Sequence, residues 1–412
     1  MKNITLAAHA VRPAGTDKIF AASQKARAAI REFGEAAVIN STLGECLDDD
    51  GKLMVLPTVE RLLRKMPVEE ICSYAPIAGV EGFNEAVQIS LFGKIRDDCF
   101  IESVATPGGC GALRHAIWNF LDEGDCAITT NYHWGPYKGI CQEHDRRLDT
   151  FEMFDACGKF NLDALDRKIA EVAKKQKQIL IILNTPANNP TGYSMSKGEM
   201  EQAIAIIKRY AEDKTKNITL CLDVSYIDFA GEFAESRAVF EPVRDLPDNM
   251  MVVVVFSMSK SFTMCGMRCG ALVCLGTTKE SATVFKEAMS FSSRSTWSNV
   301  VRSAQKVLTD ICLDPELKLQ VDGERLRFKE IISERGNAFL EAANRAGLNC
   351  CPYKHGYFIT IPCENPEYIA EQLQKRLVFI VPMAGGIRFS PCAVTKEKCL
   401  RAPEIIKEVL GE

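Results

Sequence analysis

The apolar run Met251 to Phe256 limits how this chain can fold. It holds four consecutive valines and is too short for a helix of its own, and β-branched residues favour strands. Such a run predicts a strand buried on both faces of a parallel sheet. Sheets of this kind bind ligands at the carboxyl ends of their strands, and this strand is followed by Ser257, Ser259 and Lys260.

Further strand-like segments alternate with helical patterns between about residues 100 and 300. We expect strands at 127–130, 179–183, 218–222 and 271–275. A helix is expected to begin after Ser196, because Glu199 completes a capping box with it. This alternation predicts an α/β fold with a mostly parallel sheet covered by helices. A chain of 412 residues exceeds one ordinary core, and from Asp314 the pattern turns helical and charged, so we expect a second domain there.

Composition excludes several classes of partner. A net charge of -4 gives no basic footprint for nucleic acid or for an anionic membrane surface, and no apolar run reaches the ~20 residues of a membrane span. The amino terminus does not resemble a signal peptide. The 17 cysteines are scattered without a Cys-x-x-Cys pair, which predicts reduced thiols in the cytoplasm and no metal site.

Two segments carry donors that suit a phosphate. Glycines 108, 109 and 111 precede an apolar helical pattern, and backbone N–H groups at a helix start bind anions, although a simple turn is the alternative. Arg268 offers a planar fork near the hydroxyls of Ser257 and Ser259. The glycine segment 108–111 lacks the full Gly-x-Gly-x-x-Gly spacing, and the chain has no Walker Gly-Lys-Ser motif. Both absences disfavour a dinucleotide or a nucleotide as the ligand.

A carboxylate and an amide loop follow two other predicted strands. Asp223 leaves an apolar strand, so it needs hydrogen bonds or a cation such as a protonated ring nitrogen to stay ionised. The loop 184–192 reads Asn-Thr-Pro-Ala-Asn-Asn-Pro-Thr-Gly, which taken alone is an ordinary turn.

In their order and spacing, these segments resemble the pyridoxal-phosphate aminotransferases of fold type I, specifically the aspartate aminotransferase subgroup. The likeness covers roughly residues 38 to 392. It implies a large cofactor domain of residues 55–311, with a mostly parallel seven-stranded sheet between helices. It also implies a smaller α+β domain formed by residues 1–54 and 312–412, which closes on the large one and excludes water.

The resemblance implies pyridoxal 5'-phosphate as cofactor and assigns residues to it. Lys260 would form the Schiff base and move the proton at the substrate α-carbon. Asp223 would pair with the pyridine nitrogen, while Tyr226 and Asn189 would contact the ring oxygen and Trp134 would stack on the ring. The phosphate would be held by Gly108, Gly109, Cys110, Ser257, Ser259 and Arg268, with Tyr74 reaching in from a neighbouring subunit of a homodimer.

The substrate residues follow from the same likeness. Arg388 would clamp the α-carboxylate beside Trp134 and Asn189, and Gly44 would belong to the segment that closes over the substrate. Arg294 stands where dicarboxylate-specific enzymes pair with the distal carboxylate across the dimer interface. Three residues depart from the usual pattern, namely Cys110 in place of a hydroxyl residue, Tyr137 in place of a histidine, and Trp297 in place of a tyrosine.

The expected function is transfer of the amino group of an L-amino acid, with aspartate favoured, to 2-oxoglutarate. Aromatic amino acids stay open as donors, because such an arginine can swing aside. Decarboxylation or β-elimination on the same cofactor is a second alternative. A regulator that only senses the cofactor or an amino acid is a third, disfavoured because the chain keeps the whole proton-transfer set and has no room for a DNA-binding segment.

Overall fold

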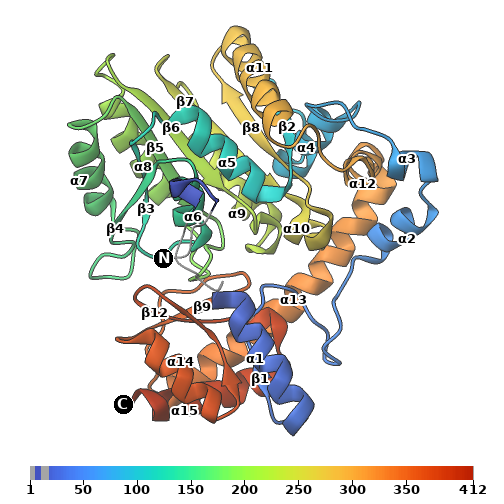
Figure 1. Ribbon diagram of the computed structural model, residues 1–412, viewed down its shortest axis with the longest axis vertical. Helices are drawn as coiled ribbons and strands as arrows, with labels where there is room; N and C mark the ends of the chain where they lie inside the picture. The colour runs from blue at the N-terminus through green and yellow to red at the C-terminus, as the bar shows by residue number, and fades with distance from the viewer. Residues whose placement is uncertain (1–4, 11–17, 412) are drawn as a thin grey trace.

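The structure is a computed structural model that describes residues 5–10 and 18–411 (Figure 1). Its α-helices are α1 (Lys18–Phe33), α2 (Pro57–Lys65), α3 (Val68–Cys72), α4 (Phe83–Phe92), α5 (Gly108–Phe120), α6 (Pro136–Glu143), α7 (Leu162–Ala173), α8 (Lys197–Tyr210), α9 (Phe233–Arg237), α10 (Met258–Ser261), α11 (Lys279–Thr296), α12 (Arg302–Leu313), α13 (Pro315–Ala346), α14 (Pro366–Lys375) and α15 (Lys396–Leu410). Short 3₁₀ helices are η1 (Ala8–Ala10), η2 (Ile227–Phe229), η3 (Ala238–Phe240), η4 (Cys265–Met267) and η5 (Pro391–Ala393).

Seven strands form the main sheet in the order β2-β8-β7-β6-β5-β3-β4. Only β8 runs antiparallel to its neighbours, and the other pairs are parallel. The predicted α/β fold with a mostly parallel seven-stranded sheet is therefore confirmed. The strands are β2 (Phe100–Thr106), β3 (Cys126–Thr130), β4 (Arg147–Phe151), β5 (Gln178–Asn184), β6 (Asn217–Asp223), β7 (Met250–Ser257) and β8 (Gly270–Gly276).

Helices cover both faces of this sheet, as the valines of β7 illustrate. Val253 and Val255 pack in one core cluster with side chains of α5, α6 and α11. Val252 and Val254 pack in another with side chains of α4, α7, α8 and α12. All four valines are fully buried, because successive side chains of a strand point to opposite faces.

The two edge regions of the sheet were not predicted. β2 and β4 carry charged residues, Glu102 in β2 and Arg147 and Asp149 in β4, and neither forms an uninterrupted apolar run. The buried strands and the capping box of Ser196 with Glu199 were predicted correctly to within about a residue at each end.

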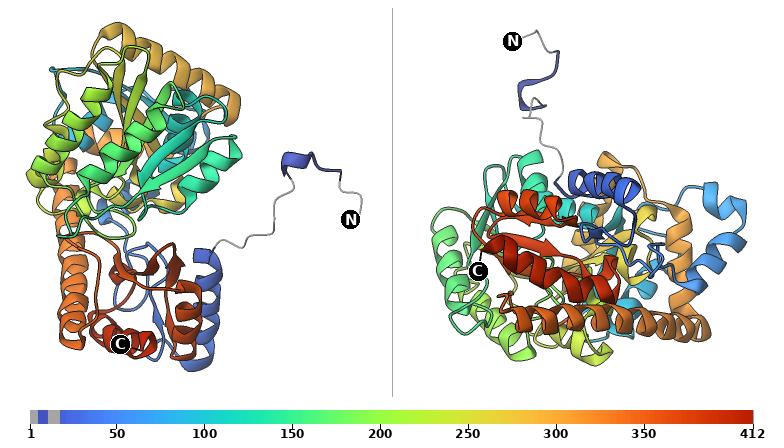
Figure 2. Two further views of the ribbon diagram at one scale, coloured as in Figure 1. Left: turned by 90° about the vertical axis from the view of Figure 1, so that its left-hand side faces the viewer. Right: turned by 90° about the horizontal axis from the view of Figure 1, so that it is seen from below.

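A second lobe is built from both ends of the chain (Figure 2). β1 (Ile39–Asn40) pairs in parallel with β10 (Val378–Phe379), and a separate antiparallel sheet has the order β11-β12-β9. Its strands are β9 (Ile359–Pro362), β11 (Val381–Met383) and β12 (Gly386–Phe389). The helices α14 and α15 pack against these strands in a separate hydrophobic cluster, which forms the core of the lobe. The boundaries at 54/55 and 311/312 stay a prediction.

The long helix α13 connects the two lobes (Figures 1 and 2). Its 32 residues span about 48 Å at ~1.5 Å per residue. Val321 near its start packs in the core of the sheet, whereas Phe339 packs in the core of the second lobe. The helix α13 therefore contributes side chains to the cores of both lobes.

Candidate active site

Three neighbouring strands end at one edge of the main sheet and place polar groups there. Asn184 at the end of β5 is opposite Asp223 at the end of β6, and Ser257 ends β7. A pocket lies at this edge and brings together segments that are far apart in sequence. Its lining residues are Gly109, Cys110, Leu113, Trp134, Asn184, Asn189, Asp223, Ser225, Tyr226, Ser257, Ser259, Lys260, Cys265 and Arg268.

Asp223 is the buried carboxylate of the pocket. It is 4% exposed, and its Oδ2 accepts a hydrogen bond of 2.5 Å from the hydroxyl of Tyr137. Its Oδ1 accepts hydrogen bonds from the Ser225 hydroxyl at 2.7 Å and the Ser225 amide at 3.2 Å. Burial raises the pKa of Asp223, and these three hydrogen bonds oppose that rise. A cation beside the carboxylate would also oppose this rise of the pKa.

Lys260 lies on the short helix α10 directly after β7. Its Nζ donates a hydrogen bond to the carbonyl of Gly44, and lies 3.5 Å from Sγ of Cys265. The amino-terminal segment thus reaches the lysine, and the expected closure of this segment over the substrate stays a prediction. A side chain at position 44 would clash, because its Cβ would lie 2.7 Å from the ring of Phe358.

The start of α5 offers several groups that could hold an anion. The first turn of α5 has no side-chain cap, so its backbone N–H groups are available to a ligand. Arg268 donates to the Ser259 hydroxyl at 3.3 Å, and the Ser257 hydroxyl accepts from the Ser259 amide at 3.3 Å. A Cβ on Gly108 would lie only 2.7 Å from Arg268 Nη2, so glycine is required for this close approach. Burial raises the pKa of Cys110, which favours the neutral thiol at this rim.

Arg388 lies beside the pocket in a buried network of hydrogen bonds. Arg388 on β12 is 5% exposed and donates to the Thr42 carbonyl at 2.9 Å and to Asn189 Oδ1 at 3.3 Å. Asn189 in turn donates to the hydroxyl of Tyr226 at 3.2 Å. Arg388, Asn189 and Trp134 also line a neighbouring cleft, whose apolar walls include Ile140, Leu148, Val381, Pro382 and Met383.

Two expected site residues are exposed at the surface of one chain and line neither the pocket nor the neighbouring cleft. Tyr74 follows α3 and is 85% exposed, and Arg294 is exposed on the last turn of α11, where it donates to the Ser298 hydroxyl. Among the described residues, no group of histidine, cysteine or acidic side chains could hold a metal ion. In the same part of the chain, no helix is both long and apolar enough to cross a membrane.

Sequence reasoning missed three residues that shape the pocket. Ser225 and Asn184 contact Asp223, through its carboxylate and its carbonyl respectively, and both were within the segments already singled out. Their nearness to a carboxylate at a strand end was an available signal. Cys265 had none, because a lone cysteine five residues after the lysine has no diagnostic pattern.

The donor set fits one cofactor. An anion cradle and an amine share a pocket with a buried carboxylate, and pyridoxal phosphate offers a phosphate, an aldehyde and a basic ring nitrogen to match them. Fold and pocket thus define an enzyme of the pyridoxal-phosphate-dependent class. The model of the family described as aminotransferase class I and II matches residues 36–406, so the chain belongs to this family. It is an aminotransferase, and its cofactor is pyridoxal phosphate.

Individual relatives differ in their named substrates. The chain is 24% identical over 340 residues to a mitochondrial aspartate aminotransferase of Schizosaccharomyces pombe, covering 79% of this chain and 74% of that one. It is also 24% identical over 312 residues to an aromatic-amino-acid aminotransferase of Paracoccus denitrificans, covering 75% of each.

Solved structures show the same fold. A crystal structure of an aminotransferase from Anaerococcus prevotii has a TM-score of 0.97 at 38% identity and covers 100% of both chains. An aromatic-amino-acid aminotransferase from Burkholderia pseudomallei, covalently bound to pyridoxal phosphate, has a TM-score of 0.78 at 20% identity, covering 97% of this chain and 98% of that one.

Proposed function

We propose that this aminotransferase takes the amino group from an L-amino acid, with aspartate favoured, and passes it to 2-oxoglutarate. The observation that supports the proposal is a chain of hydrogen bonds from Tyr226 through Asn189 to Arg388, beside the pocket that Lys260 and Tyr226 line together. A lysine amine and a buried guanidinium are thus available to one amino-acid substrate. Two acidic substrates suit a site whose substrate side is cationic.

Each residue of the site has a task in this proposal. Bound pyridoxal phosphate supplies the aldehyde that takes up the amino group and the ring that takes up electrons. Lys260 would hold that aldehyde and move the proton at the substrate α-carbon. Asp223 would keep the ring nitrogen protonated, and Tyr226 with Asn189 would hold the ring oxygen. Arg388 would orient the substrate by its α-carboxylate.

The rest of the pocket would retain and orient the cofactor. Gly108, Gly109, Cys110, Ser257, Ser259 and Arg268 lie around the uncapped start of α5 and would hold the phosphate. Trp134 lines the pocket near Tyr137 and would stack on the ring.

A homodimer with shared sites completes the proposal. Tyr74 and Arg294 are exposed in one chain, so both are available to the pocket of a second copy. Tyr74 would add a phosphate contact, and Arg294 would pair with the distal carboxylate of aspartate or 2-oxoglutarate. All 17 cysteines are free thiols, which supports the cytoplasmic location.

Aromatic amino acids are the second candidate donors. The cleft beside Arg388 is lined by Trp134, Leu148 and Met383, and these apolar walls would accommodate an aromatic side chain. The two candidates differ only in the side chain that this cleft receives.

The first experiment is the absorbance spectrum of the holoenzyme before and after L-aspartate or L-tyrosine is added. The expected result is that aspartate removes the absorbance band of the cofactor bound to Lys260 (the lysine-bound band) and that 2-oxoglutarate restores it. Bleaching with tyrosine alone would move the function to aromatic donors. The Lys260→Ala variant should lack the lysine-bound band, whereas Lys216→Ala, which removes a lysine bonded to the Ala173 carbonyl, should keep it. A Lys260→Ala spectrum equal to that of the wild type would contradict the assignment.

A further inference from the structure

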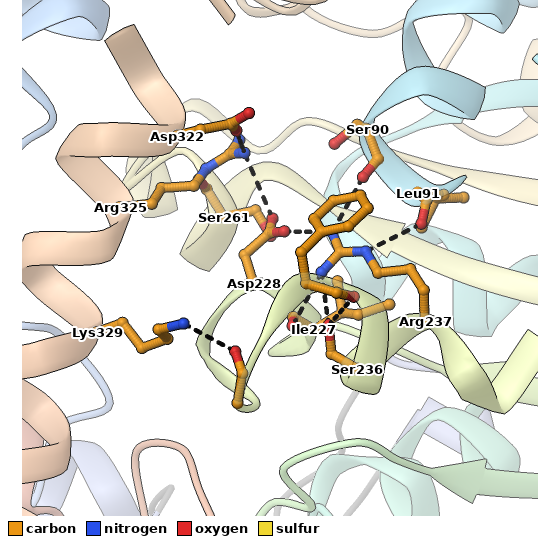
Figure 3. Close-up of polar contacts among 12 residues, drawn as sticks. Ser90, Leu91, Ile227, Asp228, Ser236, Arg237, Ser261, Asp322, Arg325 and Lys329 are labelled. Carbon is orange, nitrogen blue, oxygen red and sulfur yellow. Dashed lines mark hydrogen bonds and ion pairs between the residues drawn. The ribbon is translucent and has the colours of Figure 1, made fainter. Parts of the chain in front are cut away.

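A buried carboxylate with no task in the reaction lies just behind the pocket. Asp228 belongs to η2, two residues after Tyr226, and its side chain is only 5% exposed. Two guanidinium groups reach it from two sides, Arg237 from α9 and Arg325 from α13 (Figure 3). A buried ion pair needs such partners, because removal of either side leaves an uncompensated charge.

The charges around Asp228 keep it ionised. Burial alone would raise the pKa of Asp228, but Arg325, Arg237 and the side chain of Ser261 overcome burial and lower it to about 2. The other charged groups around Asp228 have partners of their own, although Asp322 also contacts Arg325. Lys318 contacts Asp322, and Lys329 contacts Glu232 and the Gly231 carbonyl. Asp228 is therefore a fixed anion across the working pH range.

Arg237 anchors the anion to the frame of the large lobe. It donates to the carbonyls of Ser90 and Leu91 at the end of α4, both at 3.1 Å, and to the Ile227 carbonyl at 3.3 Å. The η2 segment, which begins directly after Tyr226, is thereby tied to a helix of the main core.

Arg325 connects this anchored anion to the helix that carries Lys260. Its Nε donates to the Ser261 carbonyl at 2.6 Å, its Nη1 lies 3.9 Å from Asp228 Oδ2, and its guanidinium lies 4.2 Å above the Phe262 ring. Ser261 follows Lys260 directly in α10. One rigid planar group thus contacts both the segment after Tyr226 and the residue after Lys260, which a flexible lysine could not reproduce.

We infer that Arg325 is a positioning residue, which sets Lys260 against Tyr226 by holding the Ser261 carbonyl and the Asp228 carboxylate together. Because Arg325 lies on α13, the helix that joins the two lobes, it also links this alignment to the second lobe (Figure 1). The inference rests on the proposed roles of Lys260 and Tyr226. Neither Arg325 nor Asp228 lines the cofactor pocket.

The test is a pH titration of the cofactor's absorbance in three holoenzyme variants. Arg325→Lys keeps the positive charge but loses the directed Nε bond to Ser261. Asp228→Asn keeps the shape but loses the anion. Asp322→Asn is the matched control, because Asp322 also contacts Arg325, at 3.3 Å, yet lies on α13 itself and contacts neither site segment.

In Arg325→Lys and Asp228→Asn, the midpoint of the absorbance titration should move by about half a pH unit or more. The reason is that Lys260 would shift relative to Tyr226 and to the ring oxygen of the cofactor. The value of kcat should fall about tenfold or more, as a misplaced reacting group requires, while KM changes less than kcat. Asp322→Asn should keep the wild-type midpoint and kcat. If Arg325→Lys does not fold, Asp228→Asn carries the test.

Unchanged midpoints in both variants, even with a lower melting temperature, would show a purely structural role and overturn the inference. An equal midpoint shift in Asp322→Asn would overturn it too, because general loosening would then explain the effect. These outcomes differ from failure of the proposed function, in which Lys260→Ala would leave the wild-type absorbance band in place.

Discussion

The hydroxyl of Tyr137 donates a hydrogen bond of 2.5 Å to Oδ2 of Asp223, and both side chains are buried. Burial and the neighbouring Asp223 charge raise the pKa of Tyr137 well above its ordinary value, so it stays a neutral donor. A histidine at this position would change charge near neutral pH. The tyrosine therefore stabilises the Asp223 carboxylate and does not itself change charge near neutral pH.

We expect Tyr137→Phe to weaken cofactor retention at mildly acidic pH. Loss of a hydrogen bond to a charged group costs about 1.5–3 kcal/mol. The pKa of Asp223, already raised by burial, should rise further, because the Tyr137 hydrogen bond opposes that rise. As pH falls, Asp223 should take up its proton at a higher pH than in the wild type. The measurement is the fraction of bound cofactor against pH.

Tyr193→Phe is the matched control for this variant. Tyr193 also donates a 2.5 Å hydrogen bond to a carboxylate, that of Glu199, but it lies outside the pocket. Its cofactor retention should follow the wild-type curve. Equal curves for Tyr137→Phe and the wild type would contradict the prediction.

Gly108→Ala should weaken cofactor binding about tenfold or more. The new Cβ would lie 2.7 Å from Arg268 Nη2 and displace this proposed phosphate donor, and at φ +68° it would add backbone strain of roughly 1–2 kcal/mol. Gly124→Ala separates the two effects, because Gly124 has φ +82° and nothing within 4 Å of its Cβ position. Equilibrium binding of pyridoxal phosphate should change in the first variant alone. Equal losses in both variants would assign the effect to strain.

Arg294→Ala should lower kcat/KM for aspartate about 100-fold, because a charge-assisted bond to the distal carboxylate is worth up to about 3 kcal/mol. The value for tyrosine should change little. Arg376→Ala removes another exposed arginine, which pairs with Glu408, and should affect neither substrate. Equal losses for aspartate and tyrosine would argue against a distal clamp.

Mixed dimers test whether Arg294 acts across the interface. A hybrid of one Lys260→Ala chain and one Arg294→Ala chain keeps one intact site only if the two residues of a site come from different chains. In a random mixture about half of the dimers are hybrids, so about a quarter of the wild-type aspartate activity should return. No recovery, with hybrids shown to form, would place both residues in the same chain's site.

His115 should make stability depend on pH. Burial, and to a smaller degree Arg114, lowers the pKa of His115 to about 3, so the folded protein keeps it neutral. Between pH ~6.5 and ~3 the unfolded chain binds a proton that the folded chain does not. The free energy of unfolding therefore decreases as the pH is lowered through this range, by up to about 1.4 kcal/mol per pH unit. His115→Gln should flatten this slope in denaturant titrations. An unchanged slope in His115→Gln would refute the assignment.

Local sequence patterns determined the buried central strands of this protein and the start of α8. Four consecutive valines can be buried on both faces only in a central strand, and Ser196 with Glu199 marks a helix start through contacts three residues apart. These signals depend on neighbours along the chain. Asp223 and Ser257 each follow a predicted strand, and because parallel strands end at one edge, both line the same pocket.

Contacts between residues that are far apart in the sequence were decided only by the tertiary structure. The pairing of β1 with β10, the hydrogen bond from Tyr137 to Asp223, and the bridge from Arg325 to Asp228 and Ser261 join such segments. No periodicity encodes them, because a side chain's partner depends on how whole elements pack. The sequence could therefore name Lys260 and Tyr226, but the group that holds them in place became visible only in the folded chain.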